Sequence, residues 1–489
     1  MTSLPPLNDT IVAIASAPGV GAVGVVRLSG PEAYRIADQL FAPRRGGVPS
    51  SRPPGRVIYG QVVDGRTNGA SPGGRDRVPG ADAAEVAAVD RTEQAGRALV
   101  VDEALMLTFK APRSYTAQDV VELQTHGGPA VLRATLDLCV ANGARLAGPG
   151  EFTLRAYLNG RIDLVQAESV LEMVNAQSEG ARRNAALGLG GALTRRLEAI
   201  QTRLTGAYAA VQASFDYPDE GVPEAELGTP LGQAAEEVSA LLATAEAGRL
   251  SRQGARLALL GRPNAGKSSL LNALLGYQRS IVSDTPGTTR DYLEAPLVIG
   301  GVPVTAIDTA GIRDAADAIE ASGVEQARRI GEHADLRVVL IDGSEPLEPE
   351  DEALIVSMPA ERTLVVINKR DRPAAFDAAK LPLPPGARPL ELSALTGTGL
   401  AELLRAITEK LIGDAAGTEL WITQERHVAA LEAVAAHLSA AQERANEGDL
   451  DLVALELQDA LGALGRMTGR QDVTDETLAA IFANFCVGK

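Results

Sequence analysis

The chain has 489 residues, with 46 Lys and Arg against 63 Asp and Glu and a formal net charge of −17. So acidic a surface repels a polyanion, which excludes broad nucleic-acid binding by the chain alone and leaves local contacts or contacts through a partner. Its two cysteines, Cys139 and Cys486, exclude a disulfide framework and favour a reducing compartment. The start of the chain lacks the pattern of a signal peptide, and no apolar run reaches the roughly 18–20 residues that span a bilayer. We therefore expect a cytoplasmic protein of about three domains.

The N-terminal part has the pattern of an α+β domain over residues 1–160. Residues 10–29 are rich in Ile, Val, Ala and Gly and predict two strands joined by a Gly-rich turn. Residues 46–96 carry many Gly, Pro, Arg and Asp, which predicts a solvated loop insertion that is partly flexible. Strand patterns resume over residues 98–109, and a helix is predicted over residues 119–142.

Two stretches with helical periodicity flank an α/β segment. The helices are predicted within residues 163–213, 224–249, 426–444, 450–464 and 474–484. This arrangement predicts one helical domain, over residues 161–252 and 413–489, interrupted by an inserted domain over residues 253–412. Two separate helical domains are the alternative.

The inserted segment opens with a phosphate-binding loop. Residues 255–260 predict a buried strand, residues 269–275 the start of a helix, and Gly261 to Ser268 between them fit the pattern G-x-x-x-x-G-K-[ST]. Backbone N–H groups at such a helix N-terminus cradle phosphates. Lys267 is expected at the β- and γ-phosphates, with the Ser268 hydroxyl on Mg²⁺. The alternative is a glycine-bearing turn that binds no ligand.

Further motifs follow in the order found in Ras-like GTPases. Asp308-Thr-Ala-Gly311 follows a predicted strand, and Asn368-Lys-Arg-Asp371 follows another. The Asp371 carboxylate can accept hydrogen bonds from the guanine N1–H and 2-amino groups, a pattern that adenine does not offer. Ser393-Ala-Leu395 would support the base, and Asp284 to Asp291 fit a first switch in which Thr289 is a second Mg²⁺ ligand.

The catalytic glutamine of Ras-like proteins is missing. Ile312 follows the Asp308–Gly311 motif, and an apolar side chain cannot orient water. Acidic side chains that could take over this role follow it: Asp314, Asp317 and Glu320. Arg290 and Arg313 could act as arginine fingers or be solvated surface charges.

The remaining motifs resemble those of the tRNA modification GTPase MnmE (TrmE) family over nearly the whole chain. They are Asp9–Ala13, Arg27–Gly30, Ser114–Thr116, Asp119–Glu122, His126–Gly128, Pro149–Thr153, Arg155–Asn159, Gln166–Glu168 and the terminal Phe485–Lys489. The resemblance implies a folate-binding N-terminal domain similar to the glycine-cleavage T-protein, an interrupted all-α domain and an inserted Ras-like α/β P-loop G domain. It also implies a homodimer joined through the N-terminal domains.

The resemblance further implies a reaction and its partners. Family members work with the FAD-dependent protein MnmG, in a heterotetramer or larger complex. Together they place an aminomethyl-type (carboxymethylaminomethyl) group on carbon 5 of the wobble uridine of tRNA. The one-carbon unit comes from a tetrahydrofolate derivative, 5-formyl or 5,10-methylene, and the folate-contacting positions correspond to Arg27, Glu122, Arg161 and Lys489.

The resemblance implies activation by K⁺ and by dimerisation of the G domains. Ligands to K⁺ would be Asn264, Ser283, Thr285 and Thr288, with the ion in the place of an arginine finger, and Glu320 would position the attacking water. Asn264 could instead be a turn residue with local hydrogen bonds, and Glu320 a charge on a helix surface. With the motifs above, the expected GTP contacts are Asn264, Ala265, Gly266, Lys267, Ser268, Ser269, Ser283, Asp284, Thr285, Pro286, Gly287, Thr288, Thr289, Asp308, Thr309, Ala310, Gly311, Asn368, Lys369, Asp371, Ser393, Ala394 and Leu395.

The chain departs from the family pattern at two places. Many relatives read Gly-Glu where this chain has Ala117-Gln118, which weakens any role for a carboxylate there. Arg161 stands where some members carry Lys, and a guanidinium differs from an ammonium as a hydrogen-bond donor.

Cys486 is a candidate catalytic residue. It lies near the chain end beside Lys489, whose ammonium would favour a thiolate. Cys139 lies in an apolar stretch typical of a core residue. Two other functions remain open: a regulatory switch that binds RNA or ribosomes, similar to Era or Der, and a plain folate-dependent aminomethyltransferase.

Overall fold

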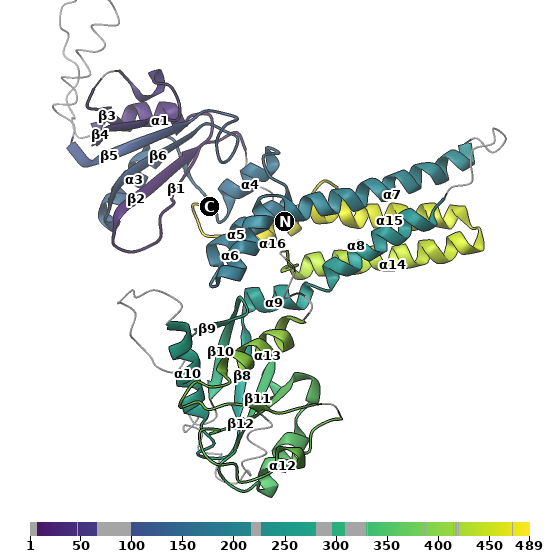
Figure 1. Cartoon of the computed structure of the whole chain (residues 1–489). Helices are drawn as coiled ribbons and strands as arrows, with labels where there is room; N and C mark the ends of the chain where they lie inside the picture. Colours follow the sequence, from purple (N-terminus) through teal and green to yellow (C-terminus); the bar gives the residue numbers. More distant parts are fainter. Residues whose placement is uncertain are drawn as a thin grey trace, which may run out of the picture. The chain divides into compact units, whose positions relative to one another are not determined.

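The computed structural model divides into two compact units, residues 1–171 with 469–489 and residues 172–468 (Figure 1). It describes residues 7–489 except 46, 66–98, 217–225, 280–295, 309–328, 330, 386, 414, 416–417, 419 and 472. Each unit contains one sheet, and each is built around its own buried apolar cluster.

The first unit holds a seven-stranded sheet in the order β3-β4-β5-β6-β2-β1-β7. Its strands are β1 (Ile11–Ile14), β2 (Gly21–Ser29), β3 (Phe41–Pro43), β4 (Val57–Asp64), β5 (Leu99–Phe109), β6 (Val120–Gly127) and β7 (Arg145–Leu146). All neighbours are antiparallel except β1 and β7. Helices α1 (Ala33–Leu40) and α3 (Pro129–Ala141) cover one face, where alternate strand residues such as Met106 and Leu123 are fully buried.

Two predictions for this unit were wrong in part. The helix predicted over residues 119–142 begins only at Pro129, because residues 120–127 form the interior strand β6. Buried and more exposed residues alternate along its second half with the period of a strand, and β-branched Val120, Val121 and Thr125 favour extended backbone. The loop predicted over residues 46–96 contains a 3-10 turn, Pro49–Ser51, and all of β4, where Ile58 and Val62 are buried. The predicted strands within residues 10–29 and 98–109 are confirmed by β1, β2 and β5.

The end of the chain packs inside the first unit. Helix α16 (Asp475–Ala483) shares an apolar cluster with α4 (Glu151–Leu158) and the start of α5 (Leu164–Asn175), in which Phe482 and Phe485 are buried. The last residues then return toward the sheet, where Val487 forms an isolated antiparallel bridge with Pro149.

The second unit holds a six-stranded sheet in the order β13-β12-β11-β8-β10-β9. The strands are β8 (Ala255–Leu260), β9 (Pro296–Ile299), β10 (Val302–Asp308), β11 (Leu336–Asp342), β12 (Thr363–Asn368) and β13 (Leu390–Glu391). Every neighbouring pair is parallel except β9 and β10. The helices around it are α10 (Lys267–Arg279), α12 (Pro349–Ser357) and α13 (Leu400–Ile412), with 3-10 turns at Ala360–Arg362 and Ala378–Lys380.

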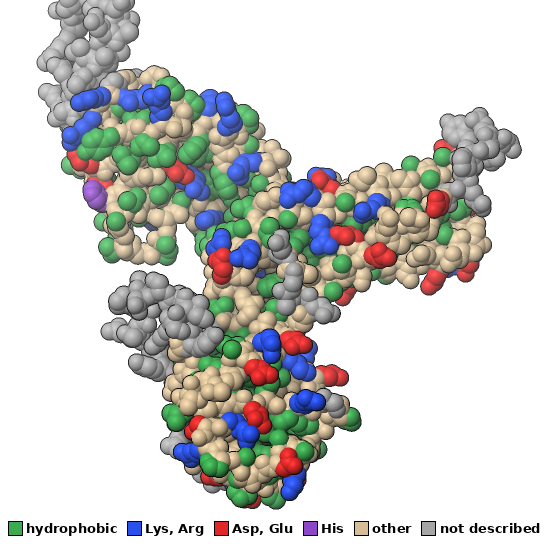
Figure 2. Space-filling model, in the orientation of Figure 1, with side chains coloured by type: hydrophobic (Ala, Val, Ile, Leu, Met, Phe, Trp, Pro, Cys, Tyr) green, Lys and Arg blue, Asp and Glu red, His purple; other side chains and the backbone are tan. Residues whose placement is uncertain are grey.

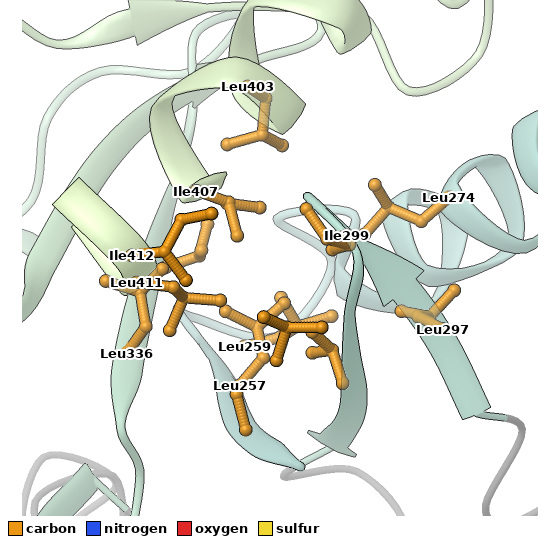
Figure 3. Close-up of a cluster of buried hydrophobic side chains, with 14 of the residues drawn as sticks. Leu257, Leu259, Leu274, Leu297, Ile299, Leu336, Leu403, Ile407, Leu411 and Ile412 are labelled. Carbon is orange, nitrogen blue, oxygen red and sulfur yellow. The ribbon is translucent and has the colours of Figure 1, made fainter. Parts of the chain in front are cut away.

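The core of this sheet lies between α13, α10 and the strands (Figure 3). Leu403, Ile407 and Leu411 of α13 point at Leu257 and Leu259 of β8 in that view. Strands buried in this way read as near-continuous apolar runs, as β8 and β11 do.

Four long helices of the second unit form a bundle. They are α7 (Ala192–Asp216), α8 (Gly228–Leu242), α14 (Glu425–Glu447) and α15 (Leu450–Thr468), and each packs on two of the others. The first pair precedes the six-stranded sheet in the sequence and the second pair follows it. The shorter helix α6 (Glu179–Leu189) precedes α7 in the sequence, and α9 (Ala245–Gln253) follows α8. The helices predicted within residues 163–213, 224–249, 426–444, 450–464 and 474–484 are confirmed by α5 to α9 and α14 to α16.

No helix in the described part of the chain is both long enough and apolar enough to span a bilayer.

Gly248 of α9 lies against the backbone of the segment that returns from the sheet to the bundle. A methyl group at this position would come within 1.9 Å of the Ile422 carbonyl oxygen, so backbone must shift. We expect Gly248→Ala to lower the free energy of unfolding by about 1–3 kcal/mol, the usual effect of overpacking, as measured by urea denaturation.

The matched control is Gly232→Ala on α8, where a methyl group meets nothing within 4 Å. Because alanine stabilises a helix more than glycine does, the free energy of unfolding of this variant should rise by about 0.5–1 kcal/mol. A Gly248→Ala protein as stable as wild type would contradict the packing described here.

Candidate functional site

The motif loops of the second unit meet at one edge of its sheet. The phosphate loop follows β8, Asp308 ends β10, Asn368 ends β12, and Ser393 follows β13. Because these strands are parallel, their carboxyl ends lie together, which is where ligands bind in sheets of this kind.

The side chain of Lys267 hydrogen-bonds to the backbone of the phosphate loop. Lys267 donates hydrogen bonds from Nζ to the carbonyl oxygens of Gly261, at 2.8 Å, and Arg262, at 3.0 Å. These carbonyls hold the ammonium over the loop that, in this motif, takes the phosphates. Ser268 and Ser269 lie at the start of α10, and Ala265 is buried just before it.

Asn368 connects the phosphate loop to the base-binding loops. Its Nδ2 donates to the Ala265 carbonyl at 2.9 Å, and its Oδ1 accepts from the Ala394 N–H at 3.0 Å. The side chain is almost fully buried, with 1% of its surface exposed. A Cβ on Gly266 would lie 2.2 Å from Nδ2, so glycine is required there, also because its φ is +100°.

Two further contacts shape the loop after β12. Lys369, in a left-handed conformation at φ +61°, forms an ion pair with Asp342 at 2.5 Å. Burial would raise the pKa of Asp342, but the hydrogen bonds from Lys369 and Ser344 outweigh it and lower the pKa. Ser393 donates to Asp371 at 2.5 Å, and this bond lowers the pKa of Asp371. Asp371 is exposed to solvent, and so is Leu395, by 82%.

Several predicted site residues lie outside the described residues. They are Ser283, Asp284, Thr285, Pro286, Gly287, Thr288, Thr289, Thr309, Ala310, Gly311 and Glu320, together with Arg290, Ile312, Arg313, Asp314 and Asp317. For Asp308 the structure describes the backbone, paired with Leu259 of β8. Asn264 is described, exposed and in a left-handed conformation at φ +65°.

A second group of predicted residues converges in the first unit, around Tyr115. Arg27 on β2 pairs with Glu122 on β6 at 2.8 Å, and its Nη1 donates to the Gly488 carbonyl at 3.2 Å. Its guanidinium lies 5.7 Å from the Tyr115 ring centre and Arg161 lies 5.0 Å from it, distances typical of cation–π contacts. Two cations on one aromatic ring form a surface suited to a flat anionic ligand.

The C-terminal tail forms one side of this group. Gly150 donates its N–H to the Cys486 carbonyl, and a Cβ on Gly488 would lie 2.4 Å from the Ile14 carbonyl oxygen. These contacts hold the tail against β1 and the start of α4. They leave Cys486 exposed, whereas burial raises the pKa of the Cys139 thiol to about 12. Lys489 donates its backbone N–H to the Cys486 carbonyl at 3.3 Å.

A buried ion network lies within the same unit. Arg155, fully buried, pairs with Asp9 at 2.5 Å and with Glu151 at 2.9 Å, and Arg145 pairs with both carboxylates. Burial would raise the pKa of Asp9 and of Glu151, but the hydrogen bonds from Arg145 and Arg155 outweigh it and lower both. The network ties the start of the chain to α4.

The first departure from the family pattern, Ala117-Gln118, has structural consequences. Gln118 Oε1 accepts from Ser29 and Arg155, while its Nε2 donates to the Leu7 carbonyl at 3.1 Å. An ionised carboxylate could not make the last bond, so an amide satisfies both kinds of neighbour. Ala117 adopts φ +58°, a conformation that glycine takes without strain.

Sequence reasoning missed Asp342 and the stacking role of Phe152. Asp342 ends the mostly apolar strand that begins at Leu336. A carboxylate at the end of a buried strand was the signal by which this residue could have been found. Phe152 lies 5.7 Å from the Arg27 guanidinium, with no sequence signal beyond its place in the Pro149–Thr153 motif. Among the described residues, no cluster of three or more His, Cys, Asp or Glu is placed to hold a metal ion.

Asp371→Asn should raise the Kd for GDP about 100-fold, which corresponds to roughly 2.7 kcal/mol. The reason is that an amide offers one acceptor and places a donor against the guanine donors. Equilibrium titration with GDP measures this, and xanthosine diphosphate, whose C2 carbonyl accepts a hydrogen bond, is the control and should bind the variant better than wild type. A GDP affinity within threefold of wild type would rule out this role of Asp371.

The ion network predicts a dependence of stability on acid. The folded-state pKa values of Asp9 and Glu151 lie below their ordinary values of 3.8 and 4.5, so their contribution is complete above about pH 4.5. It is lost as pH falls through the depressed folded-state values. Hydrogen exchange of first-unit amides between pH 7 and pH 3 should show this loss of protection.

Asp9→Asn should lower the free energy of unfolding by about 1–2 kcal/mol at pH 7. The reason is that a neutral amide replaces the carboxylate that pairs with buried Arg155. The same variant should lose less of its stability in acid than wild type does. Equal acid sensitivity of the two proteins would show that the network does not govern this dependence.

Comparisons with known proteins cover nearly the whole chain. The family model for the GTP-binding protein TrmE N-terminus matches residues 10–161, and the model for the MnmE helical domain matches residues 164–486. A tRNA modification GTPase MnmE of Thermus thermophilus is 46% identical over 99% of this chain and 100% of its own length. That of Chloroflexus aurantiacus is 42% identical over 99% and 100%. Among solved structures, the G domain of the T. maritima FeoB iron transporter is 27% identical, covering 32% of this chain and 98% of that one at a TM-score of 0.24.

The relatives match over the whole chain, at an identity that leaves no ambiguity about descent. The guanine-nucleotide loops at the edge of the second sheet agree with the activity in their names. The chain is therefore a GTP hydrolase and belongs to the family of tRNA modification GTPases MnmE.

Proposed function

We propose that this chain is a K⁺-activated GTP hydrolase that, with the FAD-dependent partner MnmG, forms the carboxymethylaminomethyl-type modification at carbon 5 of the tRNA wobble uridine. The one-carbon unit would come from a tetrahydrofolate derivative bound in the first unit. The observation that carries the proposal is that one chain combines a guanine-nucleotide edge with a separate cationic and aromatic group around Tyr115. A regulatory switch of the Era or Der type would have no use for the second group.

For the nucleotide, the described residues suit the roles proposed for them. Asn368, Lys369 and Asp371 would take the guanine side, with Ser393 fixing the Asp371 carboxylate. Lys267 would exchange its two loop carbonyls for phosphate oxygens. Ser268, with Thr289, would hold Mg²⁺, which supplies charge neutralisation at the phosphates.

For K⁺, the supporting observation is the conformation of Asn264. Its left-handed backbone and exposure place an amide side chain on the solvent side of the phosphate loop, where it would hold the ion with Ser283, Thr285 and Thr288. Glu320 would orient the attacking water, since Ile312 cannot. The bound ion would supply the positive charge that an arginine finger supplies elsewhere.

GTP turnover should be at least about tenfold faster in K⁺ buffer than in Na⁺ buffer. This ratio corresponds to an activation free energy that is lower by about 1.4 kcal/mol. Asn264→Ala should bring the rate in K⁺ down to the rate in Na⁺, because an oxygen ligand is lost. Asn264→Asp, which keeps an oxygen and tolerates the left-handed backbone, is the matched control and should retain a response to K⁺. Equal wild-type rates in the two salts would refute the proposed ion site.

For folate, Arg27 and Arg161, which both lie near the Tyr115 ring, would bind the carboxylates and the flat ring system, with Glu122 and Lys489 as further polar partners. The face of the sheet that carries Arg27 holds both apolar and polar side chains. Val57 lies in register with Leu107, which neighbours Glu122, and Glu122 neighbours Arg27. Cys486 is exposed and lies two residues before Gly488, whose carbonyl accepts from Arg27, and it is the proposed catalytic nucleophile.

Arg27→Ala should weaken binding of 5-formyltetrahydrofolate about 10- to 100-fold, since a charged hydrogen bond is worth roughly 1.5–3 kcal/mol. Equilibrium dialysis of the full chain measures this. Arg133→Ala is the matched control, because Arg133 is exposed on α3 and pairs only with Asp137 in the described structure. Unchanged affinity in Arg27→Ala would remove this residue from the folate site.

The homodimer is proposed on the same sheet face. Val57, Tyr59 and Leu105 are exposed by 59%, 45% and 39%. Tyr59 and Leu105 are direct cross-strand partners, and Figure 2 shows hydrophobic side chains gathered over the sheet of the first unit. Contiguous exposed apolar residues of this kind mark contact surfaces, and a second copy of this unit is the proposed occupant.

The charge is distributed unevenly, which bears on how tRNA is bound. The first unit has 19 Lys and Arg against 20 Asp and Glu, and the second has 27 against 43, so the net charges are −1 and −16. The second unit would repel the tRNA backbone more strongly. We propose that tRNA approaches the first unit and that MnmG supplies much of the basic surface, in a cytoplasmic complex.

The test of the function is nucleoside mass spectrometry of wobble uridines from a strain that lacks the endogenous gene and carries this chain. Restored aminomethyl-type modification is expected with wild type, and its absence would refute the proposed function. Full modification with Cys486→Ser would exclude a covalent role for the thiol.

A further inference from the structure

We propose that the turn between β9 and β10, Gly300-Gly301, is the contact through which the nucleotide state of the six-stranded sheet is transmitted to the four-helix bundle, by way of α6. The proposal depends only on GTP binding and hydrolysis by this chain. It therefore stands or falls separately from the tRNA and folate chemistry.

The turn meets α6 backbone to backbone. Ser178, the N-cap of α6, donates from Oγ to the Gly301 carbonyl at 2.5 Å. A Cβ on Gly180 would lie 2.7 Å from the Gly301 carbonyl oxygen and 3.0 Å from its Cα. With no side chain on either glycine, no flexible group lies between the two backbones to absorb a shift of the turn.

At its other end, β10 reaches the edge of the sheet that carries the nucleotide motifs. β10 runs from Val302 to Asp308, about 20 Å at ~3.3 Å per residue. β9 is the edge strand of the sheet, so the hairpin hydrogen-bonds to the other strands only through the parallel pairing of β10 with β8. Helices α9, α10 and α13 pack against it. Segments next to the γ-phosphate change position when it is lost. A hairpin that hydrogen-bonds to the sheet along one edge only can then shift as a unit with the turn.

On the bundle side, α6 is tied to the returning chain. Asn184, one turn beyond Gly180, makes two hydrogen bonds with the backbone of Trp421, one in each direction, and is itself buried. The next residue, Ile422, donates its N–H to Thr244 ahead of α9. α6 also packs on α7 of the bundle. Movement of the turn is thus transmitted both to α7 and to the segment that leads into α14.

The chain contains a reporter at this contact. Trp421 is its single tryptophan, 9% exposed, and a methyl group on Gly301 would lie 4.0 Å from its Cη2 atom. Its emission should therefore differ between the full-length protein loaded with GDP and with a non-hydrolysable GTP analogue, at saturating nucleotide.

Two variants interrupt the contact in different ways. Ser178→Asp keeps an acceptor for the Ala181 N–H, so α6 remains capped, but it has no proton to donate to the Gly301 carbonyl. Gly180→Ala inserts a methyl group between the backbones. In both, the nucleotide-dependent change in Trp421 emission should fall at least fivefold while the Kd for GDP stays within threefold of wild type.

Gly206→Ala on α7, where a methyl group meets nothing within 4 Å, is the matched control and should keep the full emission change. Circular dichroism and the retained GDP affinity verify folding of each variant. The proposal is overturned if wild-type emission is the same in both nucleotide states, or if Ser178→Asp and Gly180→Ala keep the full change.

Discussion

The nucleotide edge of this protein depends on one buried side-chain amide. Asn368 donates to the carbonyl of Ala265 in the phosphate loop and accepts from the N–H of Ala394 in the loop after β13. Its own backbone carbonyl accepts from the N–H of Gly343, after β11. Loops that follow four different strands are thereby held at one spacing. Because the amide is buried, losing any of these bonds would leave polar groups unpaired in the interior.

Close backbone contacts at glycine are the second recurring constraint. At four glycines another segment approaches the backbone closely. Asn368 lies against Gly266, Gly301 against Gly180, Ile422 against Gly248, and Ile14 against Gly488. Each contact joins elements that are far apart in the sequence, and a methyl group would meet backbone or the buried amide within 3 Å. Within each unit, these close contacts follow from the absence of a side chain at glycine rather than from long side chains.

Much of the fold could be predicted because the local signals agreed with the tertiary structure. The phosphate loop lay between an apolar strand and a helix start, and the bundle helices had clear periodicity. β6 was missed because its apolar residues, Val120, Val121 and Leu123, form a short run, and short apolar runs do not distinguish a strand from a helix. β4 was missed because its neighbours in sequence are rich in Gly and Pro, while its partners β3 and β5 are supplied by the tertiary structure.

Some site residues could likewise be predicted from local motifs, and others could not. Asn368, Lys267 and Asp371 were predictable because fixed spacing carries their chemistry. The roles of Asp342, Phe152 and Gly180 depend on which distant segments meet, and no local pattern encodes that. The choice of Gln118 over a carboxylate became understandable only when Leu7 and Ser29 appeared on either side of its amide.

The role of Asn368 is most directly tested by isothermal titration of GDP into the Asn368→Ala and Asn368→Asp proteins. Both should bind GDP at least about 100-fold more weakly than wild type, equivalent to ~2.7 kcal/mol, because neither can donate to the Ala265 carbonyl. Retained α-helical circular dichroism would show that the fold survives. GDP affinity within threefold of wild type in either variant would contradict the conclusion that this amide holds the nucleotide edge together.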